Sequence, residues 1–528
     1  MKLRFRSSND KKEKKQSAKS TNTKDKDNEL DKNNFNNEIT KSLNENVSNI
    51  KTMLGEPSDL TVRELTGKTS TQKCAILYIG GLVDEQLVQN NIIKTIQENL
   101  QKSDDPTIDH IYEAVIAIAG TKKAQTLDEV SYALLSGSTI LYLDGYETAL
   151  LISAKGGEKR SIDEPPSEAL IRGPREGFIE DIHTNIAMVR RILKDPNLRI
   201  KTYETGKRSK QKIAVIYVAG ITNEKIVDEV NRRLKSMDTD YALSAGHVEQ
   251  WIQDSFLSPF PQLLETERPD RIASSVLQGK VGILVEGTPV ALLAPIVFAD
   301  TLKSLGDYSQ RWMTATIWRL IRYLSAFIAM FAPALYIALV SYHPEMLPTK
   351  LVFSIQASRE GVPFPAVIEA FLMAITFDIL HEAGVRLPKL IGSTIGIVGG
   401  LVIGESAVSA GIVSPIMVIV TALTAIASFT TPQYSVAISF RNLRYSFMFA
   451  AAILGLFGIV LVYIMINIHM VNLKSFGTPY TTPFAPVYFS DWKDLFIRSP
   501  LTMLGKRPSF YKTKDKKKLS TSKGRNDK

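Results

Sequence analysis

Apolar and polar residues follow two different patterns along this chain. Up to about residue 310, short apolar runs are separated by charged segments, which is typical of soluble domains with buried strands and amphipathic helices. From 323 to 473 several charge-free runs follow one another, and each is long enough to enter a bilayer. The pattern predicts a soluble α/β region followed by an α-helical polytopic membrane domain.

An internal repeat organises the soluble region. The segment AILYIGGLVDEQLV at 75–88 matches AVIYVAGITNEKIV at 214–227, and LLSGSTILYLDGYETALL at 134–151 matches VLQGKVGILVEGTPVALL at 276–293. Each copy contains a buried apolar strand that enters a helix through a glycine, followed by two strands joined by an acid-Gly turn. We therefore expect the soluble region to consist of two copies of one α/β unit.

The expected domain boundaries follow from these changes of pattern. Residues 1–45 are rich in Lys, Asn, Asp and Ser and cannot bury enough apolar surface to fold, so they predict a disordered arm. The segments that follow are repeat 1 at 46–160, a charged linker helix at 161–200, repeat 2 at 201–310, the membrane domain at 311–475 and a cytosolic basic tail at 476–528.

The linker helix is dense in charge and is interrupted by prolines. Its charged residues can either pin the two α/β copies together or meet an acidic partner surface, and the sequence leaves both readings open. The candidates for this coupling between domains are Arg172, Arg175, Glu176, Arg190 and Arg191.

Apolar segments divide the membrane domain into four or five pieces. They are 323–342, 363–381, two passes within 391–440 that break near 411–415, and 445–473. Arginines just before the first segment predict that its N-terminal side is cytosolic. A cytosolic tail then requires an even number of crossings, so one segment should not cross fully. The acids and prolines of 363–381 favour irregular backbone there, with 391–410 as the alternative.

A stripe of glycines lies within one of these segments. Gly392, Gly396, Gly400 and Gly404 recur at every fourth residue and therefore share one face of a helix. Small residues on a face allow two helix backbones to pack closely inside a membrane. The stripe predicts helix packing, either within the chain or between subunits.

Three acids interrupt the apolar segments: Glu369, Asp378 and Glu405. An ionised carboxylate in hydrocarbon is costly unless it is paired, protonated or hydrated, and such residues commonly mark ion or substrate paths. Their negative charge favours cations. The alternative is that each acid lies at the membrane interface or pairs with a nearby cation from the set Arg386, Lys389 and Arg441. We take the three acids as candidates for an ion path.

Composition narrows the partners and the chemistry. The net charge is +10, but residues 506–528 hold ten Lys/Arg and two Asp, which accounts for +8. A basic tail beyond the last apolar segment predicts attraction to anionic lipid rather than to nucleic acid. Cys74 is the only cysteine, and the six histidines have no metal-ligand spacing, so we expect no disulfide, metal or cofactor. No nucleophile-base constellation indicates an enzyme, and the N-terminus lacks a signal-peptide core.

Five long motifs resemble the A subunit of Ger-type spore germination nutrient receptors. They occur in order over about 45–490 and read EPPSEALIRGPREGFIEDIHTNIAMVRR, PQLLETERPDRIASSVLQGKVGILVEGTP, REGVPFPAVIEAFLMAITFDILHEAGVRLP, GSTIGIVGGLVIGESAVSAGIVSPIMVIVTALTAIASF and RNLRY. The resemblance implies a multi-pass protein of the spore inner membrane. It would act with a transporter-like, nutrient-binding B subunit and a lipoprotein C subunit.

The same resemblance implies a mechanism. A subunits would form a ring, expected to be a pentamer, that acts as a nutrient-gated cation channel and triggers germination. Two other functions remain open. A secondary transporter would carry the nutrient itself, although such proteins usually contain repeats in the membrane region, which we do not find here. A membrane-tethered scaffold subunit would recruit partners without forming a pore.

Overall fold

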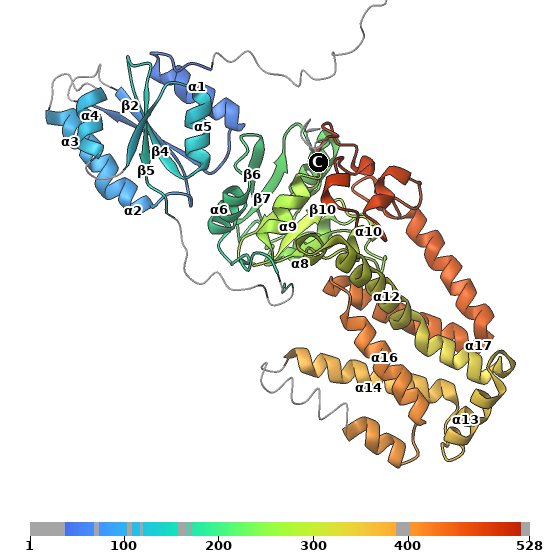
Figure 1. Ribbon diagram of the computed structural model, residues 1–528. Helices are drawn as coiled ribbons and strands as arrows, with labels where there is room; N and C mark the ends of the chain where they lie inside the picture. Colours follow the sequence, from blue (N-terminus) through green and yellow to red (C-terminus); the bar gives the residue numbers. More distant parts are fainter. Residues whose placement is uncertain are drawn as a thin grey trace, which may run out of the picture. The chain divides into compact units, whose positions relative to one another are not determined.

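The computed structural model describes residues 37–518 except 68–72, 103–107, 117–119, 157–164, 166–167, 169, 171 and 387–401. Two sheets with covering helices make up the first half of this part of the chain, and helices dominate residues 298–472 (Figure 1). The arm predicted for residues 1–45 is described only from residue 37, where Ile39 and Leu43 are already buried.

The first sheet has five antiparallel strands. In their order within the sheet they are β1 (Leu60–Thr66), β2 (Lys73–Ile79), β4 (Ser138–Leu143), β5 (Ala149–Ser153) and β3 (Thr121–Ala124). Helices cover both faces, which explains why β2 is buried along nearly its whole length. One face packs against α1 (Leu43–Leu54) and α5 (Leu127–Leu135), and the other against α2 (Glu85–Leu87), the π-helix η1 (Val88–Ile93), α3 (Lys94–Lys102) and α4 (Ile108–Ile116). We call residues 37–156 the first unit.

The second sheet repeats this strand order. Its strands are β6 (Leu198–Thr205), β7 (Gln211–Val218), β9 (Val281–Val285), β10 (Ala291–Ala294) and β8 (Leu264–Thr266). Helices α6 (Ile182–Ile192) and α9 (Pro269–Val276) cover one face, and α7 (Glu224–Lys235) and α8 (Ala245–Ile252) cover the other. In both copies an acid-Gly turn joins the two corresponding strands, with φ of +89° at Gly145 and +78° at Gly287. The two sheets share one topology, as the repeat predicts.

Helix α6 packs into the core of this second sheet, although it lies in the stretch expected to be a linker. Ile182, Ile186 and Val189 are buried against the sheet and follow the spacing of one helix face. Charged residues and prolines on both sides of the helix hide this apolar face in the composition of the stretch. We call residues 172–302 the second unit.

Two helices of the described residues are long and apolar enough to cross a membrane: α12 (Trp312–Ser341) and α17 (Tyr434–Asn472). The chain reaches α12 through the short helices α10 (Phe298–Thr301) and α11 (Gly306–Ser309). Between α12 and α17 lie η2 (Pro344–Met346), α13 (Thr349–Arg359), α14 (Ala366–Arg386), a helical stretch at 402–409 and α16 (Pro415–Phe429). The four to five spanning segments predicted from the sequence are not confirmed by length and composition alone.

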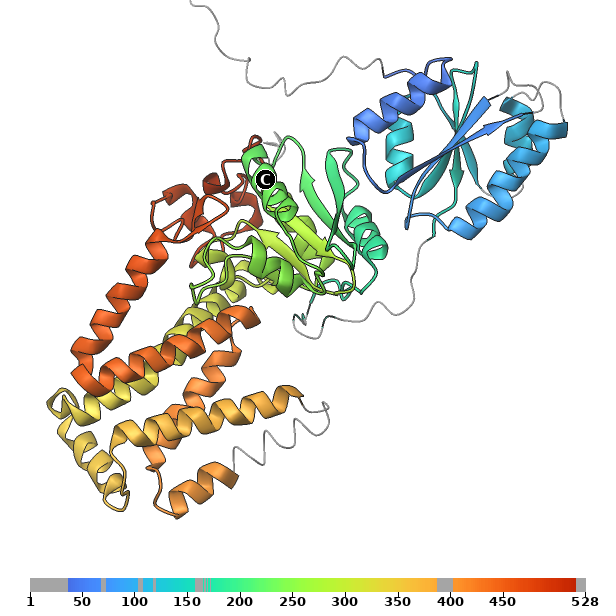
Figure 2. The same cartoon turned by 180° about the vertical axis from the view of Figure 1, so that it is seen from behind.

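Helix α17 reverses direction at Gly455. This residue has φ +59° and ψ −138°, and a Cβ built there would lie 3.0 Å from side-chain atoms of Tyr342, at the end of α12. Figures 1 and 2 both show two legs, residues 434–454 and 456–472, which diverge from this bend. The sequence predicts one apolar segment at 445–473, and the structure places this bend within it. A glycine in an apolar run does not by itself reveal such a bend.

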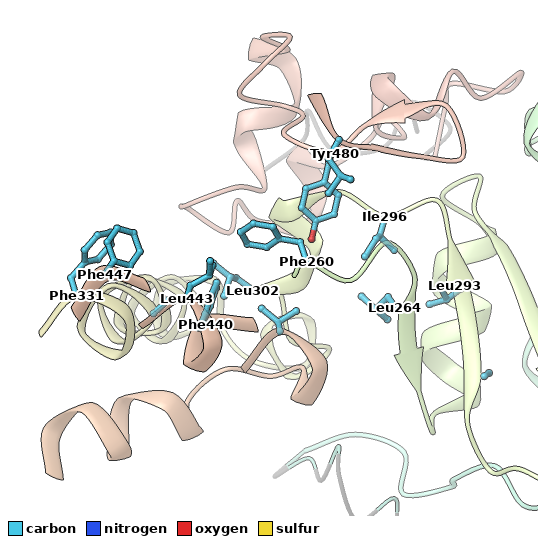
Figure 3. Packing of buried hydrophobic residues seen from close by; sticks show 14 of the residues in the cluster. Phe260, Leu264, Leu293, Ile296, Leu302, Phe331, Phe440, Leu443, Phe447 and Tyr480 are labelled. Carbon is cyan, nitrogen blue, oxygen red and sulfur yellow. The ribbon is translucent and has the colours of Figure 1, made fainter. Parts of the chain in front are cut away.

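One hydrophobic cluster joins the second sheet to the helical region (Figure 3). Leu293 of β10 and the neighbouring Phe260 and Tyr480 belong to the same cluster as Phe331 of α12 and Phe447 of α17. The rings of Phe331 and Phe447 lie 4.5 Å apart between centroids. The second unit and the long helices therefore share a core.

The chain beyond α17 folds back onto the second unit. Its short elements are β11 (Lys474–Ser475), β12 (Thr478–Pro479), η3 (Phe489–Lys493), η4 (Leu501–Met503) and η5 (Ser509–Tyr511). Tyr480 and Tyr511 are almost fully buried, and the Phe298 N–H donates to the Tyr480 carbonyl at 2.8 Å. We call residues 474–518 the C-terminal cap, since the segment expected to be a basic tail is folded this far.

Candidate functional site

The buried acid Glu369 joins three helices of the membrane region. It lies on α14 with 1% of its surface exposed. Its carboxylate accepts hydrogen bonds from the backbone N–H and the hydroxyl of Ser414 at 2.9 and 2.8 Å, and it pairs with Arg359 at 3.0 Å. Ser414 caps the N-terminus of α16, where a negative charge is favourable. Its cationic partner is Arg359 of α13, which is not among the partners expected from the sequence.

Asp378 has a cationic partner of its own. Its carboxylate pairs with the buried Arg444 of α17 at 2.9 Å and accepts a hydrogen bond from the Tyr445 hydroxyl. Because Glu369 and Asp378 are both paired, α14 needs no irregular backbone around them. It is a regular helix from residue 366 to 386, so the irregular backbone expected at 363–381 is wrong.

Glu405 differs from the other two acids. It is exposed on the helical stretch 402–409, and no ion pair forms at it within the described part of the chain. The structure thus does not bring the three acids together, and their role in an ion path stays a prediction. Of the glycine stripe, Gly404 is buried, and a Cβ there would meet Val418 of α16 at 3.5 Å. Gly392, Gly396 and Gly400 lie outside the described residues.

A second polar cluster lies where α12 begins, and its centre is Arg319. This side chain is fully buried and binds Asp307 at 3.2 Å and Asp494 of the C-terminal cap at 2.9 Å. It also donates to the carbonyl oxygens of Asp494 and Leu495, both at 3.1 Å. Arg322, one turn further along α12, pairs with Asp307 as well. The guanidinium groups fix the first turns of α12 to the cap.

The same cluster continues into the second unit through Asp300. This buried carboxylate pairs with Lys280 at 2.7 Å and with Lys303 at 3.6 Å, and it accepts a hydrogen bond from the Tyr511 hydroxyl of the cap. Burial alone would raise the pKa of Asp300, but the charges of Lys280 and Lys303 outweigh it and hold the pKa below its ordinary value. Because Lys303 also lies 3.6 Å from Asp494, one network of charges connects the second unit, α12 and the cap.

Contacts between the two α/β units involve two of the five predicted coupling residues. Arg190 is 1% exposed and forms a bidentate ion pair with Asp59, which precedes β1. Arg191 donates to the carbonyl oxygen of Gly81 at 3.2 Å. Arg172, Arg175 and Glu176 are exposed, and no ion pair forms at them within the described residues. A role in coupling stays a prediction for all five.

Sequence reasoning missed the cations that pair with the acids and the network around Arg319. Arg359 and Arg444 lie within the motifs that contain REGVPFP and RNLRY, but the linear pattern does not show that Arg359 meets Glu369 ten residues later or that Arg444 meets Asp378 across 66 residues. Among the described residues, no group of three His, Cys, Asp or Glu side chains is arranged to hold a metal ion. Cys74 is buried, which raises the pKa of its thiol to about 12.

Fold and site together define a class of protein, in which a duplicated α/β region is locked by buried ion pairs to apolar helices that suit a membrane. Comparison with known proteins narrows this class. The family model of the Bacillus/Clostridium GerA spore germination protein matches residues 48–510. The chain is 47% identical over 478 residues to spore germination protein GerLA of Bacillus cereus, which covers 90% of this chain and 97% of that protein.

A second relative agrees. Spore germination protein KA of Bacillus subtilis (strain 168) is 42% identical over 479 residues, covering 90% of this chain and 88% of that protein. The crystal structure of the N-terminal domain of the A subunit of the Bacillus megaterium spore germinant receptor GerK3 is 34% identical. It covers 49% of this chain and 97% of that chain, with a TM-score of 0.41. The chain belongs to the GerA family of spore germination proteins.

Proposed function

We propose that this chain is the A subunit of a nutrient germinant receptor and contributes a gated cation path across the spore inner membrane. The observation that carries the proposal is the 47% identity to a spore germination protein over 90% of this chain. The subunit acts with a transporter-like B subunit that binds the nutrient and with a lipoprotein C subunit. Nutrient binding shifts the open and closed populations of the channel by its difference in affinity for the two states.

Contacts at the two ends of the helices support a six-pass topology with cytosolic α/β units. The near, N-terminal end of α12 is held at the second unit by Arg322, which donates to the Leu302 carbonyl oxygen at 2.6 Å, and the distal end of α12 lies against the bend of α17 at Gly455. Both outer ends of α17 return to the second unit. Gln433 donates to Glu168 at 3.3 Å, Glu168 in turn pairs with Arg271 of that unit, and His469 shares a hydrogen bond with Ser258 at 2.9 Å. On this topology the two legs of α17 are separate crossings, one outward and one inward.

Helices α14 and α16 add to the count. Both begin near the distal end, because Glu369 binds Ser414 and the Ser414 hydroxyl lies 3.3 Å from that of Tyr336, close to the end of α12. Both run back toward the second unit, so they are two inward crossings. With α12 and the two legs of α17 they account for five crossings, and a cytosolic cap requires a sixth. An even number keeps both the α/β units and the C-terminal cap cytosolic.

Exposed apolar surface supports assembly of several copies in a bilayer. The leg 456–472 of α17 is apolar around its whole circumference, and its exposed side chains include Phe457, Val460, Tyr463, Ile464 and Met465. Lipid tails or other copies of the chain must cover such a helix. We propose a ring, expected to be a pentamer, in which the uncommitted carboxylate of Glu405 faces the ion path. Glu369 and Asp378, each tied to an arginine, hold helices in place around it.

Conductance of the complete receptor tests the proposal. The purified A, B and C subunits are reconstituted together in a planar bilayer, and current is recorded before and after the nutrient is added. We expect a nutrient-dependent, cation-selective conductance that is absent when the A subunit is left out. Silent bilayers with an intact complex would instead favour a scaffold subunit. Saturable uptake of labelled nutrient by this chain alone would favour a secondary transporter.

A further inference from the structure

The C-terminal cap exposes large apolar side chains beside the first turns of α12. Its Phe496 packs against Tyr323 with ring centroids 4.9 Å apart, and the Arg498 N–H donates to the Thr316 hydroxyl at 3.2 Å. Cap side chains that remain exposed are Phe489, Trp492, Phe496, Ile497, Leu501 and Met503. The first turns of α12 also expose apolar residues, which are Trp312, Met313, Ile317, Trp318 and Leu320. Apolar surface is therefore continuous from the helix onto the cap.

The cap also contains a cavity of about 730 Å³ with lysines in its wall. Lys493, Lys506, Lys517 and Lys518 line it, and none of the four forms an ion pair with a described residue. Lys506 and Lys517 lie directly opposite each other in an antiparallel bridge. Like charges in directly opposed positions repel, so this arrangement is destabilising unless an anion lies between or beside them.

The acids of the cavity do not neutralise these lysines. Asp494 is engaged by Arg319 and Lys303, and Asp491 accepts the backbone N–H of Ser509 at 2.9 Å. Arg507, which also lines the cavity, is paired with Asp515 at 2.7 Å. Among the other charged residues of the lining, Lys303, Asp494 and Arg507 form ion pairs and Asp491 is hydrogen-bonded to Ser509, so four lysines and one aspartate remain without an ion-pair partner among the described residues.

We propose that this cavity binds the phosphate head group of an anionic phospholipid from the cytosolic leaflet. The inference rests on the proposed function only in that α12 crosses the membrane with its near end cytosolic. Lysine ammonium groups bind phosphate as point charges, while tryptophan and other large apolar side chains settle at the level of the head groups. Met503 belongs both to the exposed apolar rim and to the cavity wall, so one lipid can contact both.

Continuity with α12 favours a lipid over free phosphate or a second copy of the chain. A free anion would use the lysines but would leave the exposed apolar rim in water. A second copy would cover the rim but would not supply charge to the cavity, unless it brought an acidic surface. A phospholipid supplies a phosphate for the lysines of the cavity and acyl chains for the apolar rim. Because α12 enters the membrane beside the cap, lipid lies next to the site.

Lipid retention by the full-length chain tests the inference. The chain is reconstituted in nanodiscs of phosphatidylcholine with about 30% phosphatidylglycerol, released gently, and analysed by native mass spectrometry for bound lipid. The cavity variant carries Lys493→Gln, Lys506→Gln and Lys517→Gln. The matched control carries Lys194→Gln, Lys201→Gln and Lys225→Gln, which are exposed lysines outside the cap. Each lysine near an anionic surface contributes roughly fivefold in affinity, so we expect at least about a tenfold loss of phosphatidylglycerol in the cavity variant alone.

Three results would overturn the inference. One is equal retention of phosphatidylglycerol by the cavity variant and the control. Another is displacement of the lipid by 10 mM inorganic phosphate, which would identify a free-anion site. The third is a change of oligomeric state in the cavity variant with lipid retention unchanged, which would identify a contact between copies. If the native receptor shows no nutrient-dependent conductance while the native chain still retains phosphatidylglycerol, the result counts against the proposed channel and not against this site.

An environment-sensitive fluorophore reports on the rim without disturbing the lysines. Because Cys74 is buried, a cysteine introduced by Met503→Cys is labelled selectively, and Ser209→Cys on the exposed turn after β6 is the control. We expect a blue shift for the label at position 503 in nanodiscs relative to a short-chain detergent, and none at 209. Equal emission at both positions in nanodiscs would contradict insertion of the rim.

Discussion

Replacing Arg319 by methionine should release the C-terminal cap from α12. The guanidinium is fully buried and binds two carboxylates and two carbonyl oxygens, so the change leaves the buried Asp307 and the half-buried Asp494 with weaker sets of partners. Removing one member of a buried ion pair costs about 3–5 kcal/mol. Because each 1.36 kcal/mol is a factor of ten, the equilibrium for local opening of the cap should rise roughly 150- to 5,000-fold.

Hydrogen exchange of the full-length chain in nanodiscs measures this opening directly. We expect amides of residues 474–518 to exchange about 100-fold faster or more in Arg319→Met, with the first sheet unchanged. Arg208→Met is the matched control, since its side chain is 86% exposed and 3.9 Å from Asp240, and such a pair contributes little. Unchanged exchange in the cap of Arg319→Met would refute the claim that this network holds the cap on the helix.

Three further changes test other parts of the structure. Gly455→Ala should destabilise the helical region by about 1–3 kcal/mol, because the backbone conformation at position 455 suits only glycine. Thermal unfolding measures this loss, and a melting temperature equal to that of the control Gly361→Ala would contradict the bend. Arg190→Met should destabilise the chain by about 3–5 kcal/mol, because it leaves Asp59 buried without its partner. Adding Asp59→Leu should restore much of this lost stability in a double-mutant cycle, and no restoration would count against the pair. Burial and the neighbouring Glu265 raise the pKa of Glu249 from 4.5 to about 8. The native state therefore binds the proton more tightly than the unfolded state and loses stability as pH rises between these values. The melting temperature of Glu249→Gln should accordingly rise relative to that of the native chain from pH 5 to pH 8, and a pH-independent difference would refute the pairing.

Local patterns in the sequence were sufficient for the α/β duplication. Two apolar strands entering helices through glycine and two acid-Gly turns recur at matching positions, and the structure has two sheets with the same strand order. Each of these signals depends on neighbouring residues only. The composition of 161–200, dense in charge and proline, favours a linker there, although the spacing of Ile182, Ile186 and Val189 marks a buried helix face.

The features that the sequence did not predict depend on contacts between distant residues. The pairs Glu369 with Arg359 and Asp378 with Arg444 form only once helices have packed, so the acids could be singled out but their partners could not. The C-terminal cap is rich in lysine, and its two buried tyrosines are too few to reveal a fold by periodicity. Burial of Arg319 requires three segments to meet, which no linear pattern indicates.

Potassium release from spores tests most directly the proposal that this subunit provides the cation path. Spores carrying the native chain, Glu405→Gln or the control Glu360→Gln are compared after nutrient addition at matched protein abundance. Glu360 is an exposed acid in the turn after α13, so its replacement removes the same charge elsewhere in the membrane region. We expect slower release or altered cation preference with Glu405→Gln and native behaviour with Glu360→Gln. Potassium release at the native rate from Glu405→Gln spores would contradict a path lined by this carboxylate. Nutrient-triggered potassium release from spores that lack the chain and its paralogues would contradict a channel role for the subunit.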